Sequence, residues 1–260
     1  MSQARRSYPS DLTDQQWEII KVMIPAARLG GRKRTTNMRW VVEALLYLTK
    51  TGSPWRYLPS EFPPWKTVHD YFTKWSEMGI WVEINLALTK MFRAQLSREP
   101  TPSLGLIDSQ SAKSHYGERR GYDAAKKVRG RKRSIIVDTL GLLWSCEVHE
   151  ANMTDPRGGL AALQKFPAEC RGRLKKFIAD SAYRWPFDYY AEKIYGLEVQ
   201  LLDTKKEGTN MKPKRWVVER TFAWFNHFRR LSRDYERLTK HSEALIYLAM
   251  ITILLRRVAP

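Results

Sequence analysis

Two aspartates each end a short apolar run. Asp108 closes LGLID and Asp180 closes FIAD. A carboxylate beside a buried strand is costly unless a cation or a metal ion compensates its charge. Functional side chains of mixed α/β sheets collect beyond the strand ends. The pattern therefore predicts that Asp108 and Asp180 lie together at one edge of a sheet, although each could instead cap a turn through the serine that follows it.

A third carboxylate, Glu219, stands in the stretch 214–231, KRWVVERTFAWFNHFRRL. This stretch has a helical apolar stripe and follows Pro213, which suits a first helical turn. Taken alone, Glu219 could form a surface ion pair with Arg215 at i, i+4. If the helix packs against the sheet that carries the two aspartates, the three carboxylates could hold two divalent cations. Oxygen ligands suit Mg²⁺ or Mn²⁺, and two such ions stabilise the attacking and leaving oxygens of a phosphodiester.

Three other aspartates have simpler interpretations. Asp138 lies in VDTLG, where turn chemistry is the better interpretation. Asp155 in MTDPRG is expected to cap a helix. Asp203 follows the apolar run LEVQLL and is the strongest substitute if one of the three ligands is misassigned.

The chain is strongly basic. Its 45 Lys and Arg against 27 Asp and Glu give a formal net charge of +18, which favours a polyanionic partner. Nucleic acid is the first candidate and an anionic membrane surface is the second. The longest apolar run, 244–255, is too short to span a bilayer. We expect double-stranded DNA as the partner, no membrane role and no small-molecule substrate.

The two cysteines, Cys146 and Cys170, match no disulfide or metal spacing, which fits a reducing cytosol. The N-terminus has no apolar core of a signal peptide. We therefore expect a cytoplasmic protein.

The first part of the chain predicts helices separated by tight turns. The helical patterns cover residues 11–24, 37–50, 66–78 and 80–96, with a short turn of helix in WRYLP between the second and third. Short helices with basic residues at their starts are typical of a helix-turn-helix module. The polar stretch SREPTPS then marks a domain boundary. We predict a helical DNA-binding domain at residues 1–97 and an α/β domain at 98–260.

In the second domain, strands and helices follow in the order β, β, β, α, β, α, β, α, α, which indicates a mixed sheet with helices on its faces. Between the first two expected strands lies a basic loop, residues 113–133, beside Asp108. Its alternatives are a solvated loop and an arm that contacts phosphates. The residues expected to contact DNA come from this loop, from the basic starts of the N-terminal helices and from the helix of Glu219: Arg32, Lys33, Arg34, Lys66, Thr67, His69, Lys74, Lys126, Lys127, Arg129, Arg131, Lys132, Arg133, Arg215 and Asn226.

Five segments together resemble the DDE transposases of bacterial insertion sequences, in the insertion-sequence-five-like group. They are WRYLP with FPPWKTV, LGLIDSQS, GYDAAKKVRGRKRSIIVDTLGLL, FIADSAYR, and RWVVERTFAWFNHFRRL. One family pattern on the glutamate helix is Tyr-x2-Arg-x3-Glu-x6-Lys. Arg215 and Glu219 fit that pattern, whereas Lys212 and Asn226 stand at the Tyr and Lys positions.

The resemblance implies an RNase H-like fold without a large insertion, and a catalytic triad formed by Asp108, Asp180 and Glu219. It also implies two Mg²⁺ or Mn²⁺ ions in each active site, cleavage at the terminal inverted repeats and joining to target DNA. A protein of this family would be bacterial and would associate with the nucleoid through DNA. Two DNA ends must be brought together, so a homodimer is expected in the active complex. The alternatives are a DNA-binding protein without catalysis, such as a repressor or a domesticated transposase, and an RNase H-like nuclease.

Overall fold

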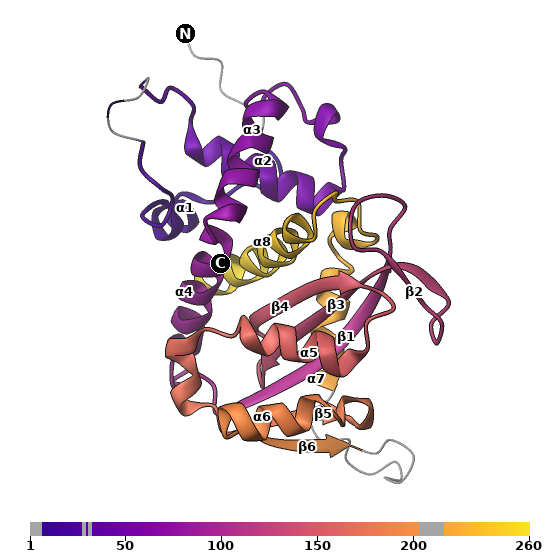
Figure 1. Ribbon diagram of the computed structural model, residues 1–260. Helices are drawn as coiled ribbons and strands as arrows, with labels where there is room; N and C mark the ends of the chain where they lie inside the picture. Colours follow the sequence, from indigo (N-terminus) through magenta and orange to yellow (C-terminus); the bar gives the residue numbers. More distant parts are fainter. Residues whose placement is uncertain (1–6, 28–29, 31–32, 203–215) are drawn as a thin grey trace.

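The computed structural model describes residues 7–27, 30, 33–202 and 216–260. The chain begins with helices and then forms a mixed sheet with helices on both faces (Figure 1). The first helices are α1 (Asp14–Lys21), α2 (Met38–Thr51), α3 (Trp65–Glu77) and α4 (Ile80–Gln95), with a 3-10 turn, η1 (Trp55–Tyr57), between α2 and α3. The helices predicted in this region are confirmed, with ends shifted by a few residues.

Local sequence explains where these helices begin and end. Thr13 caps α1 in a capping box with Gln16, so the first free N–H groups of the helix are satisfied. The side chain of Asn37 accepts from the first turn of α2 in the same way. Gly52 ends α2 at φ +74°, where its lack of a Cβ removes the steric cost of the left-handed conformation.

The sheet has six strands: β1 (Leu104–Lys113), β2 (Gly121–Asp123), β3 (Val128–Asp138), β4 (Leu143–Glu150), β5 (Lys176–Asp180) and β6 (Glu198–Leu202). β3 pairs antiparallel with β1, β2 and β4. β5 lies between β1 and β6 and runs parallel to both. The sheet is therefore mixed, as predicted.

The region predicted as a basic loop contains more strand than expected. β1 and β3 stay paired from Gly105–Asp138 as far as Lys113–Gly130, and β2 adds a short strand within residues 113–133. Polar side chains in this stretch hid the strand pattern from sequence reasoning. Backbone hydrogen bonds do not depend on apolar side chains, so the ladder continues through them.

Helices cover both faces of the sheet. On one face, α5 (Asp155–Gln164) and α6 (Phe187–Tyr195) pack against strand residues that include Ile107, Ile136 and Phe177. On the other face, α7 (Trp216–Phe225) and α8 (Thr239–Val258) share a core with Leu106, Ile135 and Ile178. Successive strand residues alternate between faces. The even-numbered positions of β1 and β5, which include Asp108 and Asp180, therefore belong to the face covered by α7 and α8.

Two predicted elements differ from the observed ones. The helix expected over 214–231 is observed as α7, which ends at Phe225, followed by a separate 3-10 turn, η4 (Arg229–Leu231); residues 214 and 215 lie outside the described part. Phe228 between them is extended and buried, so packing of this aromatic ring interrupts the helix. Asp155 is the first residue of α5 and Thr154 occupies the cap position, so the prediction that Asp155 caps the helix was wrong by one residue.

The remaining turns are short. η2 (Ala168–Arg173) leads into β5, and η3 (Ser181–Tyr183) connects β5 toward α6. Asp138 behaves as the turn residue that the sequence predicted, because its Oδ1 accepts from the backbone N–H groups of Leu140 and Leu142. The same carboxylate is buried and also pairs with Arg93 of α4.

The N-terminal helices are joined to the sheet through a shared core and through the edge strand β4. One hydrophobic cluster contains residues of α2, α3 and α4 together with α8 and one face of the sheet. Asn85 of α4 donates to the carbonyl of Leu143 at 2.8 Å, and Glu243 of α8 accepts from the N–H of Val148 at 3.0 Å. These side chains satisfy backbone groups that an edge strand leaves without a neighbouring strand.

Within the described residues, no helix is both long enough and apolar enough to cross a membrane.

Candidate active site

The two strand aspartates occupy matching positions on neighbouring parallel strands. Leu104 lies opposite Lys176 and Leu106 opposite Ile178 in the pairing of β1 with β5. The pairing ends there, and Asp108 and Asp180 each lie two residues beyond it on their own strands. Both are half-buried and belong to the sheet face covered by α7. Parallel pairing thus places two carboxylates that are 72 residues apart in sequence (180 − 108) on neighbouring strands.

Both aspartates also form local hydrogen bonds. Oδ1 of Asp108 accepts from the N–H of Ser109 at 2.7 Å. Oδ1 of Asp180 accepts from the N–H of Ala182 at 2.8 Å and so caps η3, which is the turn role considered from the sequence. A carboxylate accepts at two oxygens with about four lone-pair sites, so a turn cap is compatible with a second role as a metal ligand.

Glu219 lies in the first turn of α7 and is exposed. The helix is fixed against the sheet by buried residues, among them Val218 and Phe222, which share a core with Leu106 of β1. Thr221 adds a hydrogen bond of 2.8 Å to the carbonyl of Gly141, which ties α7 to the β3–β4 turn. The helix of Glu219 therefore packs on the same sheet face as the two aspartates, as the sequence predicted.

The described residues contain no group of three or more His, Cys, Asp and Glu side chains arranged to hold a metal ion. Asp108, Asp180 and Glu219 are therefore related by the sheet face to which they belong. Their side chains are not arranged as a complete set of metal ligands. Two candidates lie outside the described residues: Arg215, which was expected to pair with Glu219, and Asp203, which was the substitute ligand.

A buried tyrosine lies among the carboxylates of this edge. Tyr183 of η3 is 1% exposed. Burial raises the pKa of its hydroxyl well above the ordinary value, and the negative charges of Asp108, Asp155 and Asp180 act in the same direction. The hydroxyl therefore stays protonated and neutral at physiological pH. Sequence reasoning missed Tyr183, and its only signal was its place three residues after Asp180.

Behind Asp108, on the α5 face, lies a polar network that sequence reasoning also missed. Ser109 donates to Oδ1 of Asp155 at 2.7 Å, and the same oxygen accepts from Nζ of Lys132 at 2.8 Å. Nζ of Lys132 also lies 3.7 Å from Asp123. The network links β1, β3 and the start of α5 around the strand segment that carries Asp108. Its members come from distant parts of the chain, so spacing alone could not reveal it.

Most of the residues expected to contact DNA are accessible. The exposed ones are Lys33, Lys66, Lys126, Lys127, Arg129 and Asn226, and the half-buried ones are Arg34, Thr67, His69 and Lys74. Nζ of Lys126 lies 3.5 Å from the carbonyl of Ser109, so the β2–β3 turn reaches the strand beside Asp108. The ring of His69 contacts the rings of Trp55 and His241, which turns it toward the protein.

Three basic residues of the predicted loop are buried instead. Arg131 is 0% exposed, Lys132 6% and Arg133 2%. Arg131 is bound to Asp234 and to several backbone carbonyls, and Arg133 donates to the carbonyl of Leu231. This burial argues against their expected role as DNA contacts, because a side chain enclosed by the protein does not reach a phosphate at the surface. Arg32 and Arg215 lie outside the described residues.

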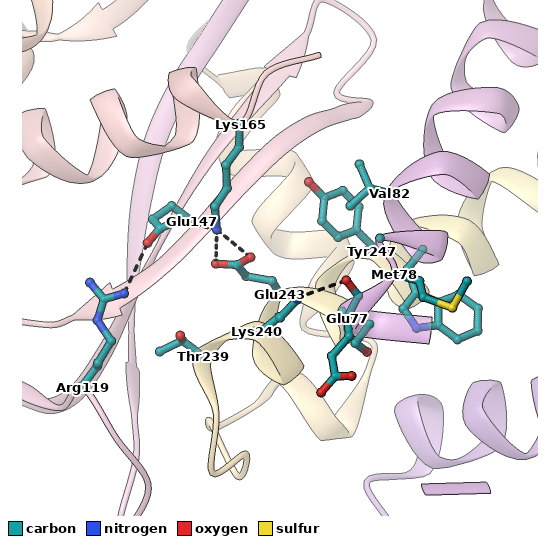
Figure 2. A pocket seen from close by; sticks show the side chains of 14 residues that line it. Glu77, Met78, Val82, Arg119, Glu147, Lys165, Thr239, Lys240, Glu243 and Tyr247 are labelled. Carbon is teal, nitrogen blue, oxygen red and sulfur yellow. Dashed lines mark hydrogen bonds and ion pairs between the residues drawn. The ribbon is translucent and has the colours of Figure 1, made fainter. Parts of the chain in front are cut away.

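A second charged region is a pocket of about 560 Å³ between the α3–α4 turn, α8 and the end of α5 (Figure 2). Nζ of Lys165 lies 2.5 Å from Glu147 and 2.7 Å from Glu243. Arg119 lies 3.8 Å from Glu147 and 3.3 Å from Glu150. Glu147 and Glu243 each face a cation from another element, so the arrangement stabilises the junction and is not a candidate for catalysis.

The fold and the carboxylate edge define a class of protein. A mixed sheet in the order β4-β3-β1-β5-β6, with aspartates on the first strand and on its parallel neighbour, is an RNase H-like α/β domain preceded by a helical region.

Comparison with known families identifies the chain more closely. Residues 99–254 match the family model described as "Transposase DDE domain". Residues 12–85 match the family described as "Putative transposase of IS4/5 family". The protein therefore belongs to the DDE transposases of insertion sequences. Transposases of this family act on DNA, and they generally use divalent metal ions.

Two relatives agree with this family. "Uncharacterized protein y4sN" of Sinorhizobium fredii is 34% identical over 104 residues, which are 40% of this chain and 77% of the relative. The "Putative transposase for insertion sequence element IS402" of Burkholderia cepacia is 32% identical over 115 residues, which are 42% of this chain and 54% of that relative. The chain thus matches only about half the length of the IS402 protein.

Proposed function

We propose that this transposase binds the terminal inverted repeats of its insertion sequence, cleaves DNA strands at the ends and joins them to target DNA. In the first step, water attacks a phosphodiester at the element's end and releases a 3′-hydroxyl. In the second step, that hydroxyl attacks a target phosphodiester. No covalent bond between protein and DNA is needed, because the attacking oxygen belongs to water in the first step and to the DNA itself in the second. In each step a DNA 3′-oxygen is the leaving group.

The observation that carries the proposal is the register of β1 and β5. Each of Asp108 and Asp180 lies two residues beyond the paired segment, and α7, which carries Glu219, packs on the sheet face to which both aspartates belong. We assign these three residues as the catalytic carboxylates. Their donor atoms are all hard oxygens, which fits Mg²⁺ or Mn²⁺, and we propose two ions in each site. Such ions, when bound, would neutralise the charge that develops on phosphate oxygens during the reaction.

The chain's own residues position the carboxylates. Asp108 is held within a strand that is paired on both sides, by β3 and by β5. Asp180 is oriented by its hydrogen bond to Ala182 at the start of η3. The core contacts of Val218 and Phe222 fix the helix that carries Glu219. Rigid elements of this kind keep a reacting geometry at a lower entropic cost than loops do.

DNA contact is proposed for the accessible basic and polar residues. The net charge of +18 supplies long-range attraction to a polyanion. Lys126, Lys127 and Arg129 lie in or beside the β2–β3 turn, which reaches the strand of Asp108. Residues 1–97 form the proposed DNA-binding domain and residues 98–260 the catalytic domain. We propose further contacts at Lys33, Lys66, Thr67, Lys74 and Asn226, and a homodimer that holds two ends together.

The deciding experiment measures cleavage and joining of labelled end DNA with Mg²⁺, for the wild type and for Glu219→Gln. Glutamine keeps the size of the side chain and removes its charge, so we expect cleavage and joining to be lost while the protein stays folded. If Glu219→Gln cuts and joins at the wild-type rate, the assignment fails. Cleavage without joining in the wild type would instead favour an RNase H-like nuclease. DNA binding with neither reaction would favour a non-catalytic DNA-binding protein.

The proposed dimer has its own test. Light scattering of the protein bound to paired ends should give the mass of two chains with two DNA duplexes. One chain holding both ends would contradict the dimer.

A further inference from the structure

One flank of α7 carries a row of aromatic and basic side chains. Trp216, Arg220 and Trp224 follow one another at intervals of four residues, so they lie along one side of the helix. The guanidinium carbon of Arg220 lies 4.6 Å from the ring centroid of Trp216 and 4.7 Å from that of Trp224. The row continues into α8, because the guanidinium of Arg257 lies over the same Trp224 ring at 4.4 Å. We call these four residues the arginine–tryptophan stack.

The stack is fastened to the turn between β3 and β4. Nη2 of Arg220 donates to the carbonyl of Leu140 at 2.9 Å. The next residue, Thr221, donates to the carbonyl of Gly141 at 2.8 Å. Trp224 approaches the same turn so closely that a Cβ added to Gly141 would lie 3.1 Å from its ring. Two consecutive carbonyls of one turn therefore hold α7 along this flank.

Glu219 lies on the other flank of the same helix. The buried residues of α7 are Val217, Val218, Thr221, Phe222 and Phe225. At 3.6 residues per turn each residue is rotated by about 100° from the one before, so Arg220 and Trp224 border this buried face on one side and Glu219 borders it on the other. In the sheet, β5 with Asp180 lies on the opposite side of β1 from β3. A contact that fixes the first flank of α7 therefore also sets the direction of Glu219.

A guanidinium between rings restrains a helix differently from an apolar contact. Apolar packing is not directional, so it holds α7 on the sheet without specifying one rotation as narrowly. A guanidinium is planar and donates hydrogen bonds in a rigid fork, so its position is fixed by rings and acceptor together. The two rings of its own helix orient Arg220. A rotation of α7 about its axis would break the hydrogen bond to Leu140 and the contact of Trp224 with Arg257.

The stack also contains features that do not favour stability. In the described part of the chain, neither Arg220 nor Arg257 forms an ion pair with a carboxylate, and Nε of Arg220 is buried without a hydrogen-bond partner there. Burial lowers the pKa of Arg257, and the positive charge of Arg220 acts in the same direction. An apolar side chain at position 220 would avoid both the repulsion and the unsatisfied donor, which argues against a role in stability alone.

We infer that Arg220 is a positioning residue, which through the stack sets the rotation of α7 about its axis and so directs Glu219 toward the site of Asp108 and Asp180. The inference rests on the proposed function, in which Glu219 binds a divalent cation. Arg220 itself contacts neither DNA nor metal in this role. Groups that orient a metal ligand through contacts behind it contribute about 10- to 100-fold to metal affinity.

The first test measures binding of Mn²⁺ alone, without DNA, from the loss of the free-ion signal in electron paramagnetic resonance. Arg220→Met keeps a long unbranched side chain and removes the guanidinium. Arg171→Met is the matched control. Arg171 also lies over an aromatic ring, that of Tyr195 at 5.0 Å, and donates to the carbonyl of Gln164 at 2.9 Å. It stands in η2, however, which packs on the α5 face of the sheet.

We expect Arg220→Met to bind Mn²⁺ about 10- to 100-fold more weakly than the wild type. Arg171→Met should bind it like the wild type, although both variants should unfold at a lower urea concentration. Charge alone predicts the opposite sign, because removal of a positive charge lowers the repulsion of a cation and would tighten binding. Equal or tighter binding of Mn²⁺ by Arg220→Met would therefore overturn the positioning role.

A second measurement follows the helix itself, without metal. Spin labels at Ala223→Cys on α7 and Glu83→Cys on α4, both exposed positions, report the distance between the two helices by double electron–electron resonance. The native Cys146 and Cys170 are buried, so the labels attach to the introduced cysteines. Arg220→Met should shift or broaden the distance distribution, and the Arg171 control should leave it unchanged. An unchanged distribution in Arg220→Met would show that the stack does not set the rotation of α7.

Failure of the inference and failure of the proposed function are distinguishable, because Glu219→Gln enters the same Mn²⁺ measurement. If Glu219→Gln binds Mn²⁺ like the wild type while Arg220→Met changes the distance distribution, the carboxylate assignment fails and the hold of the stack on α7 stands. A wild type that binds no Mn²⁺ would count against the metal site in the same way, and the spin labels would then decide on the stack. If Glu219→Gln weakens Mn²⁺ binding and Arg220→Met does not, the positioning role fails and the assignment stands.

Discussion

Acidic residues gather in two regions of this protein, and the regions are built in opposite ways. In the pocket of Figure 2, Glu147 and Glu243 alternate with Arg119 and Lys165, at separations of 2.5–3.8 Å. At the edge of the sheet, Asp108 and Asp180 instead follow the paired segments of two neighbouring parallel strands, so two like charges belong to the same sheet face.

The difference separates a stabilising role from the catalytic role that we propose. Alternating charges compensate each other, so the pocket is expected to hold α8, α5 and β4 together without a further ligand. Like charges on neighbouring strands raise the electrostatic energy of the fold unless cations compensate them. The metal ions proposed for this site would supply that compensation. Substitutions should therefore affect activity at the sheet edge and stability at the pocket.

The largest expected effect is on catalysis. Asp108→Asn should lower the rate of DNA cleavage with Mg²⁺ by at least on the order of 10²-fold, the effect of removing one preorganised electrostatic group. Its melting temperature should stay the same or rise, because one of two adjacent like charges is removed. Cleavage rates and thermal unfolding are measured together, with the exposed carboxylate variant Glu192→Gln as control. If the loss of cleavage is matched by a loss of folded protein, Asp108 stabilises the fold and the contrast between the sheet edge and the pocket fails.

A substitution in the pocket should lower the free energy of unfolding. Glu243→Ala leaves the buried N–H of Val148 without its acceptor and removes one partner of Lys165, so we expect a loss of about 1–3 kcal/mol in the free energy of unfolding. Urea unfolding measures it. Cleavage per folded molecule should match the wild type. Glu243→Gln, which keeps an acceptor, is the matched control and should lose less. A larger loss in the glutamine variant would show that the charge matters more than the hydrogen bond to Val148.

Two arginines of β3 allow a similar comparison, between a side chain expected to bind DNA and one expected to stabilise the fold. Arg129 is exposed, whereas Arg131 is fully buried and paired with Asp234 at 3.0 Å. Arg129→Ala should weaken DNA binding and lower the slope of log affinity against log salt by about one, without a change in melting temperature. Arg131→Ala should destabilise the protein by about 3–5 kcal/mol, because it leaves a buried carboxylate without its partner. Salt titrations of DNA binding test Arg129→Ala, and urea unfolding tests Arg131→Ala. An unchanged salt slope for Arg129→Ala would show that Arg129 does not contact DNA.

The smallest effect concerns pH. Burial alone would lower the pKa of Lys165, but the carboxylates of Glu243 and Glu147 raise it above its ordinary value of 10.5. A raised pKa means that the folded state holds the proton more tightly than the unfolded state. The stabilisation is therefore fully present below about pH 10.5 and is lost as pH rises through the folded pKa.

The difference in melting temperature between the wild type and Lys165→Met should thus be constant from pH 7 to 9 and shrink above about pH 10.5. Differential scanning calorimetry across this range would show it. A difference that shrinks already between pH 7 and 9 would mean that the ion pairs with Glu147 and Glu243 do not raise the pKa.

Much of the fold could be predicted from sequence because its elements carry local signals. Thr13 and Asn37 mark helix starts, Gly52 marks a helix end, and the apolar runs before Asp108 and Asp180 mark strands. The order of helices and strands in the second half followed from the same patterns, apart from β2. The extension of β1 and β3 into the basic stretch could not be predicted, because its polar side chains lack the alternation that identifies a half-buried strand.

For the candidate site, the sequence determined which residues are able to bind metal and DNA, since residue type fixes donor atoms and charge. It did not determine which of them are accessible. Arg129 and Arg131 are two residues apart in one basic run. Arg131 pairs with β1 and with β4 and is buried, whereas Arg129 pairs with the short strand β2 and is exposed. The register of β1 and β5, the network of Ser109 with Asp155 and the contact of Arg257 with Trp224 were likewise decided by tertiary structure. Each depends on contacts between segments far apart in the chain, and local sequence does not encode such contacts.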